Sequence, residues 1–233
     1  MKQKVALITA AGSGMGAECA RALASAGWRV AVSSSSGRGE ALGRELGGLG
    51  FTASNTDPEA LARVVQGTLA AYGRIDAVVN SCGGIPYGDL LAIPDADWHA
   101  GLDMVLLSVI RIARLVTPTF EAQGAGVIVN ISSFAAVEPN LTYPVSSALR
   151  SALSGFTKMY AERYAATHIR MNNVLPGFVL TKTESEAVKE RVPMHRYGSA
   201  AEIAGTVLFL LSDAAAYITG QNIRIDGGLS RSL

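Results

Sequence analysis

Short runs of β-branched and apolar residues alternate with helical patterns along the whole chain. The strand candidates are KVALIT, RVAVSS, FTASN, IDAVVNS, GVIVNIS, RMNNVLP and NIRID. Each consecutive pair of these runs is separated by a segment with helical periodicity. Strands connected through helices pair in parallel with right-handed crossovers. The pattern therefore predicts an α/β fold with one doubly wound parallel sheet of about seven strands and helices on both faces.

The helical patterns indicate one uninterrupted domain. They cover residues 16–27, 39–50, 56–73, about 95–123, the stretch after Pro144 and 200–212, with one further short helix between 181 and 198. No linker or repeat interrupts them, and the only low-complexity stretch is a run of four serines at 33–36. A chain of 233 residues can bury one large core, so we expect a single domain over 1–233.

Composition excludes several classes of function. Lysine and arginine total 20 against 19 acids, without a basic stripe, so no nucleic-acid partner is expected. Cys19 and Cys82 have no neighbouring ligand at metal spacing, which argues against a metal site and against a disulfide scaffold. No segment provides the roughly 20 apolar residues of a membrane span. We expect a soluble, cytoplasmic protein that acts on a small molecule and does not bind a membrane.

The turn after the first strand has the composition of a dinucleotide site. Gly12, Gly14 and Gly16 lie between a strand and a helix. Glycines at this place let the backbone approach a pyrophosphate, whose charge meets the free N–H groups of the helix N-terminus. The spacing is G-x-G-x-G instead of the common G-x-G-x-x-G, and tight turns also use glycine for conformational reasons alone.

The end of the second strand bears on cofactor choice. Proteins that select NAD usually place an acid here against the ribose hydroxyls. This chain has the serines 33–36 followed by Arg38, and hydroxyls with an arginine suit a 2′-phosphate better than a carboxylate would. The cofactor is therefore NADP(H) or NAD(H), with NADP(H) slightly preferred, and an ordinary polar loop remains an equal interpretation.

Several motifs in order resemble the short-chain dehydrogenase/reductase family along nearly the whole chain. TAAGSGMG is similar to its glycine turn, with Ala10 where the first glycine is expected. NSCG at 80–83 resembles its N-N-A-G, and VIVNISS at 127–133 matches the strand that ends in the catalytic serine. The segments IRMNNVLPGFVLT at 169–181 and EIAG to DGG at 202–228 resemble the nicotinamide-side and C-terminal signatures.

This resemblance implies a Rossmann-type NAD(P)(H)-dependent oxidoreductase that acts on a small carbonyl or alcohol. It implies a homotetramer or homodimer through the helices at about 97–121 and 145–166. It also implies the following cofactor-binding residues: Thr9, Gly12, Ser13, Gly14, Met15, Gly16, Ser34, Arg38, Asn80, Cys82, Gly83, Ile131, Arg150, Pro176, Gly177, Val179 and Thr181.

The catalytic positions depart from the family pattern of asparagine, serine, tyrosine and lysine. Matching those positions to the family pattern gives Val105, Ser133, Ser146 and Arg150. An aliphatic hydroxyl is too weak an acid to replace a phenol, so we do not expect Ser146 to perform the family's proton transfer. Tyr143, one helical turn earlier, is the alternative donor, with Arg150 as the nearby cation.

Three hypotheses follow for function. The first is an oxidoreductase with the altered set Ser133, Tyr143 or Ser146, and Arg150. The second is a non-redox lyase that resembles the halohydrin dehalogenases and uses Ser133 and Arg150. The third is a dinucleotide-binding homologue without catalysis. Arg150 itself has an alternative structural role, as the partner of an acid on a neighbouring helix or subunit. His195 and Arg196 are candidates for lining a small substrate pocket.

Overall fold

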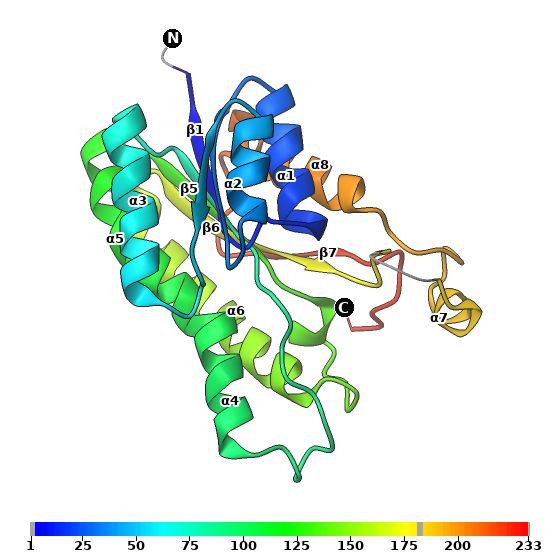
Figure 1. Cartoon of the computed structure of the whole chain (residues 1–233). Coiled ribbons are helices and arrows are strands. Elements are labelled where there is room, and N and C mark those ends of the chain that lie inside the picture. Colours follow the sequence, from blue (N-terminus) through cyan, green and yellow to red (C-terminus); the bar gives the residue numbers. More distant parts are fainter. Residues whose placement is uncertain (1–2, 181–183, 233) are drawn as a thin grey trace.

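The computed structural model describes residues 3–180 and 184–232. Its described residues form one parallel sheet of seven strands, as the alternating pattern predicts, and the strand order is β3-β2-β1-β4-β5-β6-β7 (Figure 1). The strands are β1 Val5–Ile8, β2 Arg29–Ser34, β3 Leu49–Thr52, β4 Ala77–Asn80, β5 Gly126–Ile131, β6 Ile169–Pro176 and β7 Asn222–Ile225.

Helices cover both faces of the sheet, which confirms the doubly wound architecture. They are α1 Gly14–Ser25, α2 Arg38–Glu45, α3 Pro58–Tyr72, α4 Asp95–Leu102, α5 Ser108–Gln123, α6 Pro144–Tyr164, α7 Glu186–Arg191 and α8 Ala200–Leu211. One core cluster joins α1, α2 and α8 to the sheet, and a second joins α3, α5 and α6 to the opposite face. In Figure 1, α1, α2 and α8 lie on one side of the strands and α3 and α5 on the other.

Local chemistry explains where the elements end. The Asp57 side chain accepts hydrogen bonds from the backbone N–H groups of Glu59 and Ala60 at the start of α3, and Gly73 closes that helix with φ 70°. The expected helix 39–50 ends earlier than predicted, because Gly47 adopts φ 64° just after α2. Strand β3 consequently begins at Leu49, two residues before the predicted start.

The long helix predicted over about 95–123 contains an interruption. A π-helical turn, Asp103–Leu107, separates α4 from α5 without ending the helical path. Such a turn inserts one extra residue, and a hydrophobic pattern of helical period does not reveal it. The π turn places Val105 in the molecule's interior, next to the carboxyl ends of β4 and β5.

A row of asparagines crosses four neighbouring strands, from the carboxyl ends of β4 and β5 through the middle of β6 to the first residue of β7. Asn80, Asn130, Asn173 and Asn222 are paired in register from β4 to β7. Each side-chain N–H₂ donates to the next carboxamide oxygen, at 2.9, 2.9 and 2.8 Å. The row satisfies buried polar groups internally and fixes the strand ends against one another. It forms the floor beneath the sites described next.

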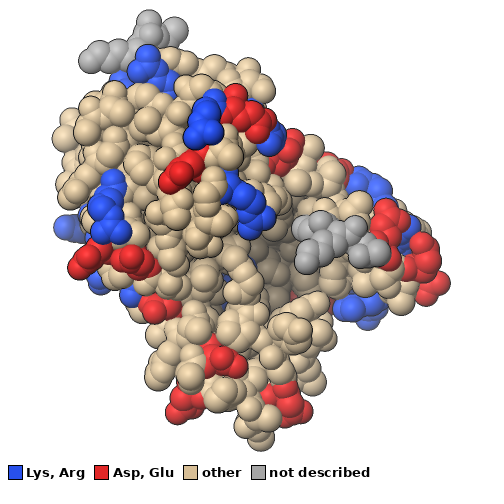
Figure 2. Space-filling model, viewed as in Figure 1, with Lys and Arg blue, Asp and Glu red and all other residues tan. Residues whose placement is uncertain are grey.

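Charge and hydropathy on the surface follow from the composition. On the face in Figure 2, basic and acidic residues are interspersed among uncharged ones, except that the part over α4 shows acids alone. No helix among residues 3–180 and 184–232 is long and apolar enough to cross a membrane.

Candidate active site

A cavity of about 330 Å³ opens at the carboxyl ends of β1, β2, β3 and β4. Strand order reverses between β1 and β4, and open α/β sheets bind ligands at this point. The cavity is lined by Ala10, Gly12, Ser13, Gly14, Met15, Ser34, Ser35, Arg38, Ser54, Asn55, Ser81, Cys82, Gly83 and Met104. Eight of the residues expected to bind the cofactor are therefore brought together here: Gly12, Ser13, Gly14, Met15, Ser34, Arg38, Cys82 and Gly83.

The N-terminus of α1 is suited to hold a phosphate. Gly14 has φ 61°, in the left-handed region that glycine favours. The Ser13 side chain makes no capping hydrogen bond, and the first turn contains no acid. By contrast, Asp57 caps the N-terminus of α3, and a complete capping box caps the N-terminus of α8. The first N–H groups of α1 therefore lack a side-chain partner, and the helix dipole there favours an anion.

The second end of the cavity carries hydroxyls and a guanidinium. Ser34 lies at the end of β2, with its Oγ 3.4 Å from Oγ of Ser36. The Nε of Arg38 donates to Ser36 Oγ at 3.2 Å, and no acid within the described chain forms an ion pair with Arg38. A cation and hydroxyls without a carboxylate fit a ribose 2′-phosphate. Together with the uncapped helix end, this arrangement fits NADP(H).

Thr9 and Asn80 support the cavity from behind instead of lining it. The Thr9 hydroxyl donates to the carbonyl oxygen of Ser81 at 3.3 Å and accepts from the N–H of Ser81 at 3.2 Å. Asn80 is buried and begins the asparagine row. Both residues hold the segment 81–83 at the cavity wall.

An arginine in the second turn of α6 contacts the wall of this cavity through Cys82. Arg150 is 7% exposed. Its Nε donates to Ser146 Oγ at 3.0 Å, its Nη1 to the carbonyl oxygen of Ile131 at 3.2 Å and its Nη2 to Cys82 Sγ at 3.0 Å. No acid in the described part of the chain lies within ion-pair distance of Arg150, so an intrachain ion pair does not account for its position.

Two serine hydroxyls, one after β5 and one in the first turn of α6, share one property. Ser133 Oγ accepts from the backbone N–H of Ala135 at 3.2 Å, and Ser146 Oγ accepts from Arg150 Nε at 3.0 Å. A serine oxygen that already accepts retains its O–H for donation. Ser146 is in contact with Arg150, and Ser133 follows by two residues Ile131, whose carbonyl oxygen accepts from Arg150; the three donors are named here the donor cluster.

Tyr143 lies at the N-cap of α6 and is 41% exposed. Its carbonyl oxygen accepts from Ser147, but its phenol makes no hydrogen bond to any described residue. Of the two candidate residues for proton transfer, the structure places Ser146, and not Tyr143, in contact with Arg150.

The π turn closes the site from below. A small space of about 10 Å³ lies between the asparagine row and the guanidinium, lined in part by Asn80, Val105, Ser108 and Arg150. Sequence reasoning did not identify three polar residues here, Ser108, Asn130 and Ser132. The buried Oγ of Ser132 has no hydrogen-bond partner in the described chain. Asn130 and Ser132 could have been found in the sequence, because they are polar residues within the otherwise apolar run VIVNISS.

The remaining expected residues lie outside the lining of this cavity or outside the described residues. Pro176 ends β6, and a Cβ on Gly177 would lie 2.8 Å from Cα of Asp226, so only glycine fits there. Val179 pairs with Gly198 in a short parallel bridge. Gly16 packs against Ala11 behind the first turn. Thr181 lies outside the described residues.

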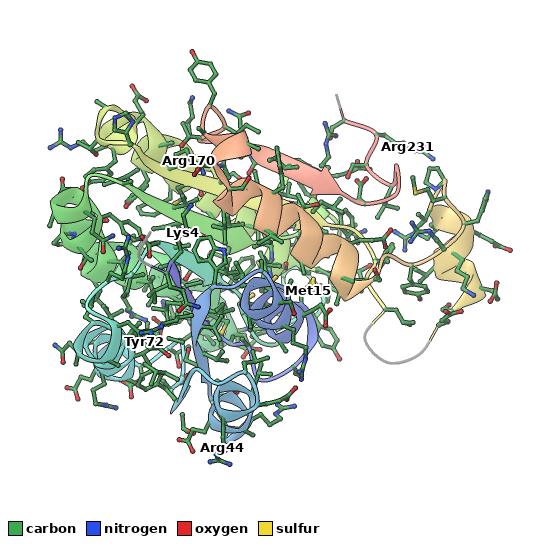
Figure 3. The ribbon with its side chains drawn as sticks, turned by 90° about the horizontal axis from the view of Figure 1, so that it is seen from above. Lys4, Met15, Arg44, Tyr72, Arg170 and Arg231 are labelled. Carbon is green, nitrogen blue, oxygen red and sulfur yellow. The ribbon has the colours of Figure 1, made fainter. Side chains whose placement is uncertain are left out.

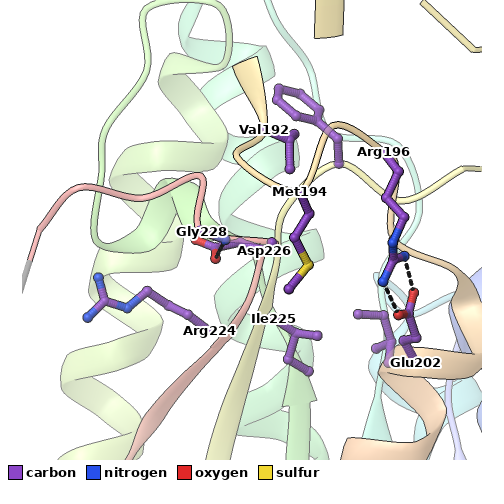
Figure 4. Close-up of a pocket in the computed structure, with 12 residues that line it drawn as sticks. Val192, Met194, Arg196, Glu202, Arg224, Ile225, Asp226 and Gly228 are labelled. Atoms are coloured by element: carbon purple, nitrogen blue, oxygen red, sulfur yellow. Dashed lines mark hydrogen bonds and ion pairs between the residues drawn. The ribbon is translucent and has the colours of Figure 1, made fainter. Parts of the chain in front are cut away.

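A second cavity of about 340 Å³ lies beside β7, between the segment 192–198 and the start of α8 (Figure 4). Arg196 is among its lining residues, and the guanidinium is bonded to Glu202 at 2.7 and 2.9 Å. Met194 points into the same space, whereas His195 is not among the lining residues.

Comparison with known proteins gives consistent matches over the whole length. Residues 9–230 match a family model described as enoyl-(acyl carrier protein) reductase. A 3-oxoacyl-[acyl-carrier-protein] reductase of Thermotoga maritima is 34% identical over 242 residues, covering 98% of both chains. Reductases with the same name from Synechocystis (35% identical, 97% and 96% covered) and Escherichia coli (33%, 97% of both) are similarly related.

Proposed function

The chain belongs to the short-chain dehydrogenase/reductase family, and from this premise we propose that it is an NADP(H)-dependent oxidoreductase acting on a small carbonyl or alcohol. One observation carries the proposal: Cys82 lines the cavity with the uncapped helix end and accepts a hydrogen bond from Arg150 of the donor cluster. A nucleotide site and a group of donors for a carbonyl oxygen are thus adjacent.

The cofactor would be held by two groups of residues. The N-terminal amides of α1, reached over Gly12 and Gly14, would bind the diphosphate, and Ser34 with Arg38 would bind the 2′-phosphate. NADPH would supply the hydride when bound. Pro176 and Gly177 support the nicotinamide side by the close packing of β6 against Asp226.

The donor cluster would act on the reacting oxygen. Ser133 and Ser146 can each donate an O–H to a carbonyl oxygen, and Arg150 places a fixed positive charge behind them. Preorganised donors of this kind stabilise negative charge as it develops on oxygen. Arginine cannot release a proton near neutral pH, and a serine hydroxyl is too weak an acid. We assign proton delivery to the Tyr143 phenol, one helical turn before Ser146.

The assignment is tested by Tyr143→Phe with Tyr87→Phe as a matched control, since Tyr87 is 76% exposed outside both cavities. NADPH binding is measured by calorimetry, and NADPH oxidation is measured with a panel of small carbonyls that includes 3-oxoacyl thioesters. We expect Tyr143→Phe to lower turnover by about 10²-fold or more at unchanged NADPH affinity. Full turnover in this variant would remove Tyr143 from the mechanism.

The exposed, unbonded phenol of Tyr143 favours a second candidate, a nucleotide-binding protein without hydride transfer. Its expected result is tight NADPH binding with no oxidation by any carbonyl of the panel. The lyase alternative is checked in parallel, because halide release from a vicinal haloalcohol without added nucleotide would support it. If neither NADPH nor NADH binds at millimolar concentration, both the oxidoreductase and the nucleotide-binding protein without hydride transfer are contradicted.

A further inference from the structure

The segment that follows β7 folds into a closed turn. The Asp226 carboxylate accepts hydrogen bonds from the backbone N–H groups of Gly228 and Ser230, both at 3.0 Å. Gly228 has φ 85°, in the left-handed region that glycine favours, which allows the chain to reverse within a few residues. Figure 3 shows Arg231 in this segment, beyond the end of β7. Residues 226–232 are named here the C-terminal strap.

The C-terminal strap packs against two segments that are distant from it in sequence. A Cβ on Gly177 would lie 2.8 Å from Cα of Asp226, so the residue after β6 and the strap are in close contact. A Cβ on Gly227 would lie 2.8 Å from Cγ1 of Val192, and the N–H of Met194 donates to the carbonyl oxygen of Gly227 at 3.3 Å. The strap therefore contacts the residues that follow β6 and those that follow α7.

A third contact joins the C-terminal strap to a residue 93 positions earlier in the chain. The backbone N–H of Arg231 donates to the carboxylate of Glu138 at 2.6 Å. Glu138 forms no ion pair with a basic side chain of the described residues. Hydrogen bonds to an ionised acceptor belong to the stronger class. The carboxylate thus holds the strap through a backbone group, whose position does not depend on the arginine side chain.

Glu138 ends a short turn that begins at Ser133 of the donor cluster. Ser133 Oγ accepts from the N–H of Ala135 at 3.2 Å, and the Ser133 carbonyl oxygen accepts from the N–H of Ala136 at 3.0 Å. The carbonyl oxygen of Phe134 accepts from the N–H of Glu138, also at 3.0 Å. The strap is therefore bonded to the outer end of the same turn whose inner end carries the Ser133 hydroxyl.

We propose that the C-terminal strap holds the Ser133 hydroxyl in place relative to the residues that follow β6, and that Glu138 is a positioning residue for this donor. The inference rests on the proposed function, in which Ser133 donates to the reacting carbonyl oxygen. Ser133 follows β5 and Gly177 follows β6, and the strap contacts the segments after both strands. A donor that is fixed before the reaction stabilises the developing charge without reorganising.

Paired variants of the full chain remove either side of this hydrogen bond. Glu138→Ala removes the acceptor, whereas Glu138→Gln keeps an acceptor oxygen. Arg231→Pro removes the N–H donor, whereas Arg231→Ala keeps it. Glu162→Ala is the matched glutamate control, because Glu162 is exposed on α6 and forms no ion pair with the described part of the chain.

Turnover is measured with the best substrate of the carbonyl panel, and NADPH affinity by calorimetry. We expect Glu138→Ala and Arg231→Pro each to lower kcat about tenfold, with NADPH affinity unchanged within about twofold. Glu138→Gln, Arg231→Ala and Glu162→Ala should keep kcat within about twofold of the native value. The double variant of Glu138→Ala and Arg231→Pro should lose no more than either single variant, because both remove the same bond. An equal loss of kcat in Glu138→Gln would overturn the inference.

Hydrogen exchange separates this inference from the proposed function, because it requires no turnover. Mass spectrometry follows the peptide that contains Ala135 and Ala136, whose amides are bonded to Ser133. We expect exchange about threefold faster or more in Glu138→Ala and Arg231→Pro, and the native rate in Glu138→Gln.

Unchanged exchange in Glu138→Ala and Arg231→Pro overturns the inference, and so does faster exchange with native kcat. If the native protein reduces no carbonyl of the panel, the oxidoreductase is overturned. Faster exchange in the two variants still supports the strap in that case, and unchanged exchange removes it.

Discussion

Glu202, near the start of α8, is a surface carboxylate whose pKa is strongly lowered. Its side chain accepts two hydrogen bonds from Arg196 and one from the backbone N–H of Ser199. The Arg196 guanidinium, and then the Ser199 donors, lower the pKa of Glu202 from 4.5 to about 2. A carboxylate with a lowered pKa contributes stability above its unfolded pKa, and the contribution is lost as pH falls through the folded value.

Glu202→Gln removes this charge and keeps an acceptor for the Ser199 N–H. We expect the native protein to have the higher Tm at pH 7, with a difference that begins to shrink below about pH 4.5 and disappears near pH 2. Because both side chains are about half exposed, added salt should reduce the difference as well. Thermal unfolding of Glu59→Gln is the control, since Glu59 lies 3.9 Å from Arg63 and should show a smaller difference. A pH-independent difference for Glu202→Gln would contradict the assignment.

Single residues of the candidate site were predictable to different degrees. Arg150 stood out in the sequence because a charge lies within an apolar helix, and in the structure it contacts Cys82 in the cavity wall. Its contact with Cys82, 68 residues away, depends on how β4 and α6 meet in space, which no local pattern encodes. The phenol of Tyr143 is one turn from Ser146 in sequence, but the N-cap geometry leaves it exposed.

At the level of helices, two N-termini that both have a serine at the N-cap differ in how that serine is used. Ser199 and Ser13 each precede a 12-residue helix, but only the Ser199 side chain caps its helix, accepting from Glu202 N–H at 3.2 Å. We expect Ser199→Ala to lower the free energy of unfolding by about 1 kcal/mol, and Ser13→Ala to leave it nearly unchanged. Urea unfolding of both variants without nucleotide measures this contrast. Equal losses would mean that Ser13 does cap α1 in solution, and the free helix end needed for a phosphate would then be absent.

Existence of the elements was predictable, and some of their limits were not. The seven strands and their parallel direction follow from apolar runs between amphipathic segments, whereas the order of the strands in the sheet was not predicted. The end of α2 was predicted too late because Leu46 and Leu49 continue the helical pattern through Gly47, and only backbone geometry shows where the helix ends. The π turn at Val105 could not be predicted from the sequence either. One inserted residue shifts the register of the helix, but the segment keeps the residue types of an ordinary helix.

At the scale of the whole molecule, the groove between α5 and α6 bears on the oligomeric state. A groove of about 490 Å³ runs between α5 and α6, and its lining includes Ile110, Phe156, Met159 and Tyr164. Met159 is 64% exposed there. The two helices are fixed to each other beneath the groove by the 2.6 Å hydrogen bond between Thr117 and Tyr160, whose pKa is raised to about 12 by burial. The lining combines these apolar side chains with Arg114 and Glu121, and such a mixed groove suits an isologous contact, in which the same surface of a second copy completes the interface.

We therefore expect the protein to form a dimer or tetramer through α5 and α6, and Met159→Glu to shift it toward monomers. Two glutamates introduced near a twofold axis would be desolvated and would repel each other, whereas each is well hydrated in the monomer. Light scattering coupled to size exclusion, over a hundredfold range of concentration, measures the shift. Met194→Glu is the matched control, because Met194 is 63% exposed but lines the cavity beside β7. If Met194→Glu dissociates the oligomer and Met159→Glu does not, the contact lies on the β7 side. An unchanged monomeric mass for the native protein would show that the groove between α5 and α6 remains open to solvent.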